Sequence, residues 1–481
     1  MSEDNFLVAN TKGLIQSFYY FCQTMKLFKK FTNPFLTKLR LDFNLKELLQ
    51  GSAIVFLFKF LGLFSGYVLS YIITKHYGEE TLGIYSLSFT LLSFVVVLSR
   101  MGLDEAMVKV ISDLFYVNKQ GQAKDAYFKS SFLILLVSAL FSVLVFQSAD
   151  YIATWFDNES LTKAFKIIAY TIVPYSLIKV NADTLRGMKK MKVFSYLQVG
   201  SLFLLMSVVL LLGIQFFDET VYMPMYALLI ATIVVYLWSC VLLKRNFKVK
   251  NTGTEKMKRL MKISLPMMLT SSMFLVLSWT DNIFLGRFLS EDQVGIYFIA
   301  FKLGLIISLS LFAINSIAAP KFSELSAAND KELLKRLAMQ SANLNLGSSL
   351  PVFIVLILTT EWLLSLYGNS FIIAKYCVYI LAVGQLFNAL SGSVLNFLNM
   401  TGNEKLVSKI VLSAALLNII LNYYLIPIFE AYDTWSGIEG AAIASSICLI
   451  YWNVLGLYFV YKHHGFLMFP NPFSLMKMKY K

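Results

Sequence analysis

The sequence predicts an all-α integral membrane protein, with about 12 transmembrane helices in two parallel six-helix repeats. Composition is the first reason: of 481 residues, 57% are hydrophobic and 15% are charged, which leaves too little polar surface for a water-soluble protein. The second reason is a series of long apolar segments separated by short polar connectors. The third is a hairpin sequence that occurs twice.

Segments of roughly 20 mostly apolar residues, the length that a membrane-spanning helix needs, recur along the chain. The connectors between them are short, and none is long enough to fold as a catalytic domain. We therefore expect a transporter and no enzyme. The predicted spans are residues 51–74, 82–99, 130–148, 164–182, 193–217, 221–243, 263–280, 293–318, 338–360, 371–398, 410–428 and 438–461.

The repeated hairpin indicates an internal duplication. Over the seventeen positions from Lys75 to Leu91, six residues are identical to those 212 positions later, among them Glu79, Gly83 and Tyr85. Each half holds six predicted spans, and six is an even number, so both halves enter the membrane the same way up. We expect them to be related by an axis along the membrane normal.

Lysine and arginine are distributed unevenly over the predicted connectors. The two tails and the even-numbered connectors hold all but seven of the 42 basic residues. Because positive charge gathers on the cytoplasmic side, both termini are predicted to be cytoplasmic. The net charge of +14 is then a topology signal and not a sign of nucleic-acid binding. The seven exceptions are Lys59, Lys75, Lys163, Lys166, Arg287, Lys302 and Lys375.

These observations divide the chain into five parts. Residues 1–50 are a basic extension, either an amphipathic segment on the cytoplasmic membrane face or a disordered tail. An N-terminal six-helix bundle covers residues 51–243 and a C-terminal one residues 263–461. The basic cytoplasmic linker 244–262 joins them, and residues 462–481 form a cytoplasmic tail.

The reactive side chains give little material for catalysis or metal binding. The four cysteines have no paired spacing and there are only three histidines, so we expect no metal site and no cofactor. The chain also lacks a phosphate-binding glycine loop, a dinucleotide-binding glycine run and a zinc-protease helix. The paired carboxylates Asp104 and Glu105 lie in a charged connector, where a solvated face explains them better than acid–base catalysis.

Two lysines lie near the predicted bilayer midplane, one in each half. Lys59 lies about 12 Å into the first span at 1.5 Å per residue, and Lys302 is similarly deep in the eighth. Since two ammonium groups facing a central cavity would attract a phosphate, we predict that both line a substrate cavity. The alternative is that each lysine snorkels to an interface or pairs with a buried acid.

Polar residues inside later spans form a second set of candidates. Asp281 ends the seventh predicted span, and Arg287 follows six residues later. Asp281 either binds a coupling cation (H⁺ or Na⁺), pairs with Arg287 or caps a helix. Structural pairing with Arg287 is the favoured hypothesis. A role in coupling or gating is the alternative for Asp281 and for Arg287. Amides within the spans either line a polar path for sugars or bridge helices. These amides are Asn315, Gln385, Asn388 and Asn418.

Motifs in both halves together resemble a known family. They are Gly51-Ser52, Lys59, Leu61-Gly62, Tyr77-Gly78, Gly83-Ile84-Tyr85 and Gly102-Leu103-Asp104, then Ser264-Leu265-Pro266, Asp281, Leu285-Gly286, Gly295-Ile296-Tyr297 and Ala319-Pro320-Lys321-Phe322-Ser323-Glu324-Leu325. From about residue 51 to 461 the chain is similar to polysaccharide-transport proteins, the O-antigen flippase-like branch of the multidrug/oligosaccharidyl-lipid/polysaccharide exporter superfamily.

This resemblance implies two six-helix bundles that form a V around a central cavity. It implies a monomer that carries a polyprenyl-diphosphate-linked oligosaccharide, for O-antigen, capsule or exopolysaccharide, across the inner membrane. Its partners would be this lipid-linked oligosaccharide, membrane lipids and possible further polysaccharide-assembly membrane proteins. Lys59 stands where relatives often place a cation, whereas residues 1–50 depart from the family pattern.

Three alternatives are weaker. A cation-coupled multidrug antiporter of the same fold would want a deep carboxylate in its first bundle, and spans one to six contain none. The major-facilitator fold usually carries a glycine-rich signature between spans two and three, which residues 100–105 do not match. A membrane-embedded glycan polymerase usually needs a large outer loop, and the predicted outer loops are all short.

Overall fold

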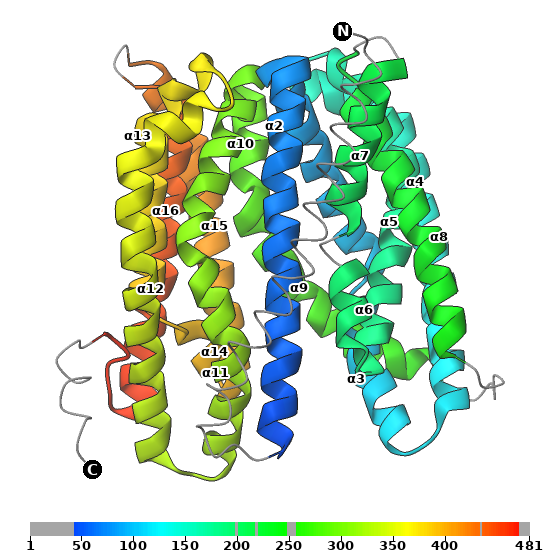
Figure 1. The fold of residues 1–481 in the computed structure, drawn as a ribbon, viewed down its shortest axis with the longest axis vertical. Helices are drawn as coiled ribbons and strands as arrows, with labels where there is room; N and C mark the ends of the chain where they lie inside the picture. The colour runs from blue at the N-terminus through cyan, green and yellow to red at the C-terminus, as the bar shows by residue number, and fades with distance from the viewer. Residues whose placement is uncertain (1–42, 198–200, 217–219, 248–255, 433–434, 471–481) are drawn as a thin grey trace, which may run out of the picture. The chain divides into compact units, whose positions relative to one another are not determined.

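The structure is a computed structural model, and α-helices make up nearly all of what it describes (Figure 1). Side chains are described from residue 60 onward, apart from a few positions between 266 and 327. Met1–Ala53 and Ile54–Lys481 are separate compact units, and the following account concerns the second. The predicted extension of residues 1–50 lies almost wholly outside the described residues, which are 43–197, 201–216, 220–247, 256–432 and 435–470.

The predicted spans of the first half all fall on helices. The first two lie in one long helix, α2 (Phe43–Arg100), which is interrupted at Gly78. Gly78 has a φ of 86°, in the left-handed region that favours glycine, so this residue makes the turn predicted between Lys75 and Glu80. The other elements are α3 (Leu103–Tyr116), α4 (Gln120–Trp155), α5 (Ser160–Gly187), α6 (Met191–Ser195), α7 (Ser201–Phe216) and α8 (Met223–Asn246).

The second half repeats this pattern with more interruptions. The eighth predicted span, residues 293–318, is broken by a short 3₁₀ turn, and the tenth, residues 371–398, is broken between Leu390 and Val394. The elements are α9 (Met257–Phe288), α10 (Glu291–Leu305), η2 (Ile306–Ser308), α11 (Leu309–Ala327), α12 (Lys331–Ser365), η3 (Asn369–Ala374), α13 (Lys375–Leu390), α14 (Val394–Met400), α15 (Glu404–Glu430) and α16 (Gly437–His464).

Within residues 54–481 the helices form two groups, which we call the first and second lobes. Helices α3–α8 pack on one another, and so do α10–α16. Figure 1 shows α2 and α9 between the two groups, and we count α2 with the first lobe and α9 with the second because each belongs to that half of the repeated sequence. Helix α9 contacts α3 and α4 of the first lobe as well as α10, α15 and α16 of the second, so it holds the lobes together.

Length and hydropathy make this a multi-pass membrane protein. Nine helices of the described residues are long and apolar enough to cross a bilayer. The other three predicted spans are the second limb of α2, the shorter apolar helix α7, and α9. Large apolar side chains point outward on the spans, as they do in contact with lipid; Leu140 is 59% exposed and Leu358 is 80% exposed.

Candidate functional site: a polar cavity, a buried carboxylate and the seam between the lobes

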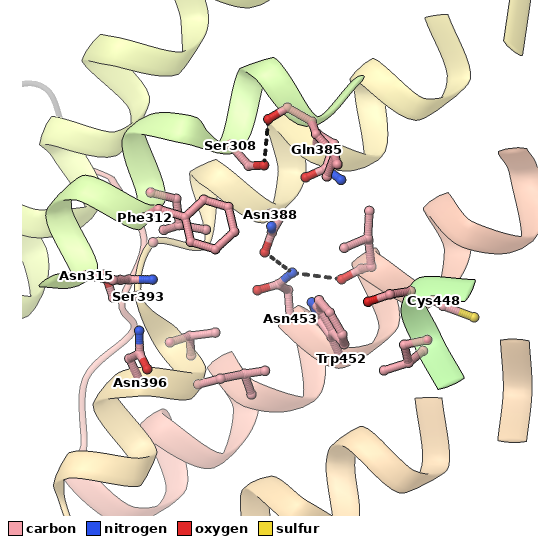
Figure 2. A pocket seen from close by; sticks show the side chains of 18 of the residues that line it. Ser308, Phe312, Asn315, Gln385, Asn388, Ser393, Asn396, Cys448, Trp452 and Asn453 are labelled. Carbon is pink, nitrogen blue, oxygen red and sulfur yellow. Dashed lines mark hydrogen bonds between the residues drawn. The ribbon is translucent and has the colours of Figure 1, made fainter. Parts of the chain in front are cut away.

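The second lobe holds a partly open cavity of about 350 Å³. Its walls come from α9, α10, η2, α11, α13, α14, α15 and α16, and Figure 2 shows side chains from several of these helices pointing into one space. Amides dominate its polar lining, and none of the described residues that line it is charged. The amides are Asn315, Gln385, Asn388, Asn396, Asn399, Asn418 and Asn453.

The sequence left two roles open for these amides, and the structure shows that some of them bridge helices. Asn453 donates hydrogen bonds to Asn388 Oδ1 at 3.0 Å and to the carbonyl of Leu449 at 2.8 Å, so it bridges α16 and α13 (Figure 2). Other polar atoms of the lining are buried and have no hydrogen-bond partner among the described residues. They are Asn315 Oδ1, Gln385 Oε1, Ser393 Oγ, Asn418 Oδ1 and Trp452 Nε1.

Asp281 lies against the wall of this cavity and is almost fully buried, with 3% of its surface exposed. Its carboxylate accepts hydrogen bonds from the hydroxyls of Tyr297 and Ser445. Asn422 and Asn418 donate to its other oxygen at 2.8 and 3.3 Å. Because Asn418 and Ser445 also line the cavity, two side chains connect the buried carboxylate to the cavity.

The predicted pairing of Asp281 with Arg287 is wrong. Helix α9 continues through Asp281 to Phe288, and six residues at 100° each place the two side chains about 120° apart around the helix, on different faces. Arg287 instead forms an ion pair with Asp157, in the turn between α4 and α5 of the first lobe. The arginine therefore joins the two lobes.

Lys302 also contacts the opposite lobe. Its ammonium donates to Ser70 Oγ at 2.7 Å and to the carbonyl of Gly66 at 3.2 Å, both on α2. It also lies 4.2 Å from the ring centre of Phe298, a cation–π contact. In this conformation the ammonium neither snorkels nor meets a carboxylate, and it faces α2.

The contacts between the lobes repeat with the same spacing as the hairpin sequence. Lys302 contacts Ser70, and Asn282 contacts Thr90 at 3.2 Å. In the repeat of 212 residues, position 70 corresponds to position 282, and position 90 corresponds to position 302. The second contact is thus the first with the halves exchanged. This reciprocity is expected for two lobes that face each other across a pseudo-two-fold axis.

The glycines of the repeated hairpin make a further reciprocal pair of contacts. A Cβ atom on Gly83 would lie 1.8 Å from the backbone oxygen of Glu291, and one on Gly295 would lie 2.4 Å from that of Glu79. Only glycine permits two helix backbones to approach so closely. We call this set of contacts the seam, made by Gly83, Gly295, Ser70, Lys302, Thr90, Asn282, Asp157 and Arg287.

Two other predicted residues remain to be placed. The side chain of Lys59 lies outside the described residues, although position 59 is helical and stands seven residues, or two turns, before Gly66 on α2. Asp104 does not lie on a solvated face as predicted. It is 5% exposed and pairs with Arg100 on the preceding turn, in a charged cavity of about 700 Å³ between α3 and α5.

A two-lobed bundle of membrane-spanning helices with a polar cavity in one lobe is typical of a membrane transporter. The chain belongs to the polysaccharide biosynthesis protein family, whose sequence profile matches residues 48–326. The profile of the MatE family matches residues 266–424.

Relatives and solved structures agree with this assignment. The probable low-salt glycan biosynthesis flippase Agl15 of Haloferax volcanii is 25% identical over 401 residues, which is 80% of this chain and 78% of the relative. The probable flippase AglR of the same organism is 28% identical over 37% of each chain.

Two solved structures share the fold. One is a multidrug-resistance MATE transporter of the MOP superfamily in an inward-facing conformation, with a TM-score of 0.73 at 16% identity. The match covers 86% of this chain and 95% of the transporter. The other is the lipid II flippase MurJ in an inward closed conformation, with a TM-score of 0.66 at 17% identity. The match covers 85% of this chain and 87% of MurJ. The predicted fold, two six-helix bundles of the MOP type, is confirmed.

Several site residues were not singled out from the sequence. Asn422 and Ser445 around Asp281, and Trp452 in the cavity, were missed, and Tyr297 was noted only as part of the repeated motif and not as a partner of Asp281. A signal existed for one of them: Asn418 and Asn422 are four residues apart, so both lie on one face of α15. Nothing local in the sequence indicates that this face meets a carboxylate 137 residues earlier.

Proposed function

We propose that this protein is a flippase that moves a polyprenyl-diphosphate-linked oligosaccharide from the inner to the outer face of the cytoplasmic membrane. The observation that carries the proposal is the uncharged, amide-lined cavity in a chain that belongs to a polysaccharide biosynthesis family. A glycan headgroup cannot cross hydrocarbon bare, since each unsatisfied polar group costs several kcal/mol there, whereas the polyprenyl tail can stay in lipid.

The diphosphate needs cations, and we assign it to Lys59 and Lys302. The seven-residue spacing puts positions 59 and 66 on the same face of α2, and Gly66 is on the face that meets Lys302. When the lobes separate, Lys302 loses Gly66 and Ser70 and becomes available to an anion. Headgroup binding would then be linked to rocking of the lobes.

We further propose that Asp281 is where transport couples to H⁺ or Na⁺. It is a buried carboxylate with two hydroxyls and two amides around it, and the amide oxygens of Asn418 and Asn422 have no partner among the described residues. Since oxygen is the ligand that hard cations prefer, rotation of the two amides would offer oxygens to an ion on Asp281. Transport by Asp281→Asn should be reduced at least about tenfold and should lose its dependence on the ion gradient.

The direct test is transport by the purified protein in liposomes. A polyprenyl diphosphate carrying fluorescent N,N′-diacetylchitobiose would be placed in both leaflets. Its exposure to an external quencher would then be measured over time. We expect the full-length protein to exchange the lipid between leaflets, while protein-free vesicles do not. Exchange no faster than in empty vesicles, under every applied H⁺ or Na⁺ gradient, would contradict the proposal.

A cation-coupled drug antiporter is the second candidate, because the MatE profile matches part of the chain. The cavity argues against it, since no carboxylate is among the described residues that line it and an organic cation would find no counter-charge there. Ethidium efflux from the same liposomes discriminates the two functions. Cytoplasmic termini, action as a monomer without enzymatic activity, and association with other polysaccharide-assembly membrane proteins are part of the flippase proposal.

A further inference from the structure

The cavity of the second lobe has a chemistry that diphosphate transport does not explain. A phosphate group is bound by lysine, arginine or a helix N-terminus. The described residues that line this cavity carry no charge and present amides, hydroxyls and aromatic rings instead. Its ligand is therefore an uncharged polar group.

The unpartnered polar atoms specify the ligand further. Asn315 Oδ1, Gln385 Oε1 and Asn418 Oδ1 are acceptors, Trp452 Nε1 is a donor and Ser393 Oγ is both. Gln385, Ser393 and Asn418 are each at least 94% buried. A buried polar atom without a hydrogen bond is destabilising, so a ligand that supplies both donors and acceptors is favoured here. Sugar hydroxyls and acetamido groups do both.

The aromatic residues fit the same class of ligand. Figure 2 shows the rings of Phe312 and Trp452 bordering the space into which Asn315, Gln385 and Asn388 point. A pyranose has an apolar face of C–H groups, which packs on an aromatic ring, and an equatorial rim of hydroxyls, which meets amides. At about 350 Å³ the cavity is at the small end of ligand sites, which run from about 300 to 1,000 Å³. It suits one or two sugar rings and not a whole repeat unit.

We propose that this cavity is a subsite that binds an uncharged sugar residue of the lipid-linked glycan, separately from the cations that hold the diphosphate. The proposal rests on the proposed flippase function and names the part of the substrate that the second lobe recognises. Asn418 then has two neighbours, because its amide nitrogen donates to Asp281 and the same side chain lines the cavity. Sugar binding and occupancy of Asp281 are linked through this one amide.

Binding of free sugars to the full-length protein tests the subsite without transport. The probes are N-acetylglucosamine, which is neutral, and glucuronate, which is anionic and of similar size, each followed by saturation-transfer NMR. We expect the neutral sugar to bind with a Kd near about 1 mM and glucuronate about tenfold more weakly. Gln385→Met and Asn315→Leu replace an amide by an apolar group of similar volume, and Trp452→Phe keeps an aromatic ring but removes the indole N–H. Each variant should weaken binding about 3- to 10-fold.

The chain supplies a matched control. Asn345 is fully buried on α12, both of its amide atoms lack a partner among the described residues, and it does not line the cavity. Asn345→Leu should therefore leave sugar binding unchanged. Equal affinity in the control and the cavity variants, preference for glucuronate, or no saturable binding of N-acetylglucosamine up to about 50 mM would each overturn the subsite.

The liposome assay separates this proposal from the flippase proposal. Exchange of the chitobiose lipid at the wild-type rate by all three cavity variants overturns the subsite and leaves the flippase intact. Specific sugar binding without any exchange of the lipid by the wild-type protein keeps the subsite and overturns the flippase. A transport defect in the cavity variants, with normal behaviour of Asn345→Leu, supports both.

Discussion

A single methyl group on Gly83 should force the seam open. Its Cβ would lie 1.8 Å from the backbone oxygen of Glu291, whereas carbon–oxygen contacts do not normally fall below about 3.3 Å. The obstacle is helix backbone and not a flexible side chain, so relief requires the two hairpins to separate by about 1.5 Å. Overpacking of this kind costs about 1–3 kcal/mol, and the cost falls only on the conformation in which the seam is closed. The equilibrium should shift about 5- to 150-fold toward the open seam.

The shift can be measured through a cysteine placed in the seam. Ser86 is fully buried and accepts a hydrogen bond from Asn282 at 3.1 Å, so a thiol at position 86 is shielded while the seam is closed. In a variant lacking the four native cysteines, Ser86→Cys should react with a membrane-impermeant thiol reagent at least about fivefold faster when Gly83 is alanine. Gly295→Ala should act in the same direction.

The control is another helical glycine. A Cβ on Gly347 would meet nothing within 4 Å, so Gly347→Ala should leave labelling at position 86 unchanged. If the cysteine at position 86 labels at the same rate in the Gly83→Ala and Gly347→Ala variants, the close approach of Gly83 to Glu291 does not limit opening. The seam is then not the element that separates during transport.

Further predictions concern the lysines and the topology. Lys59→Ala should abolish glycan export in cells while the protein still inserts into the membrane, and Lys59→Arg should keep part of the export. Lys302→Ala should reduce export more mildly, because Lys302 also has partners on α2 in the closed seam. Normal export in the double Lys59→Ala, Lys302→Ala variant would refute the anion site. Single cysteines at Asn369 should label from outside intact cells and those at Asn403 should not, since these turns lie at opposite ends of the second lobe's helices. The reverse pattern would invert the proposed orientation.

The sequence predicted the fold well because membrane spans and internal repeats leave local signals. Within the described residues each predicted span is helical, although the eighth and tenth are interrupted, since an apolar run of about 20 residues has few other stable forms in lipid. The glycine, tyrosine and acidic residues kept in register at Gly83 and Gly295 identified the repeat. The turn at Gly78 was also placed correctly, because only one short polar stretch separates the first two apolar runs.

The partners of the polar residues could not be predicted in the same way. Asp281 contacts Ser445, which lies 164 residues later, and Arg287 pairs with Asp157, which lies 130 residues earlier. Such contacts depend on how helices of different parts of the chain pack, and a sequence without this packing offers a nearby arginine as the obvious partner. Helical geometry alone argued against that choice, because residues six apart lie on different faces of a helix.

The reciprocal contacts of the seam also bear on why the two halves are one chain. In a dimer of identical subunits, both copies of an isologous contact must carry the same pair of side chains. Here one copy pairs a lysine with a serine, while the other pairs an asparagine with a threonine. A single polypeptide with two copies of the unit is free of that constraint, so mutation can place a charge on one side of the axis and a neutral amide on the other. If the proposed sugar subsite and the proposed lysine site for the diphosphate are correct, the same freedom let one lobe specialise in the sugar while the axis between the lobes binds the phosphate.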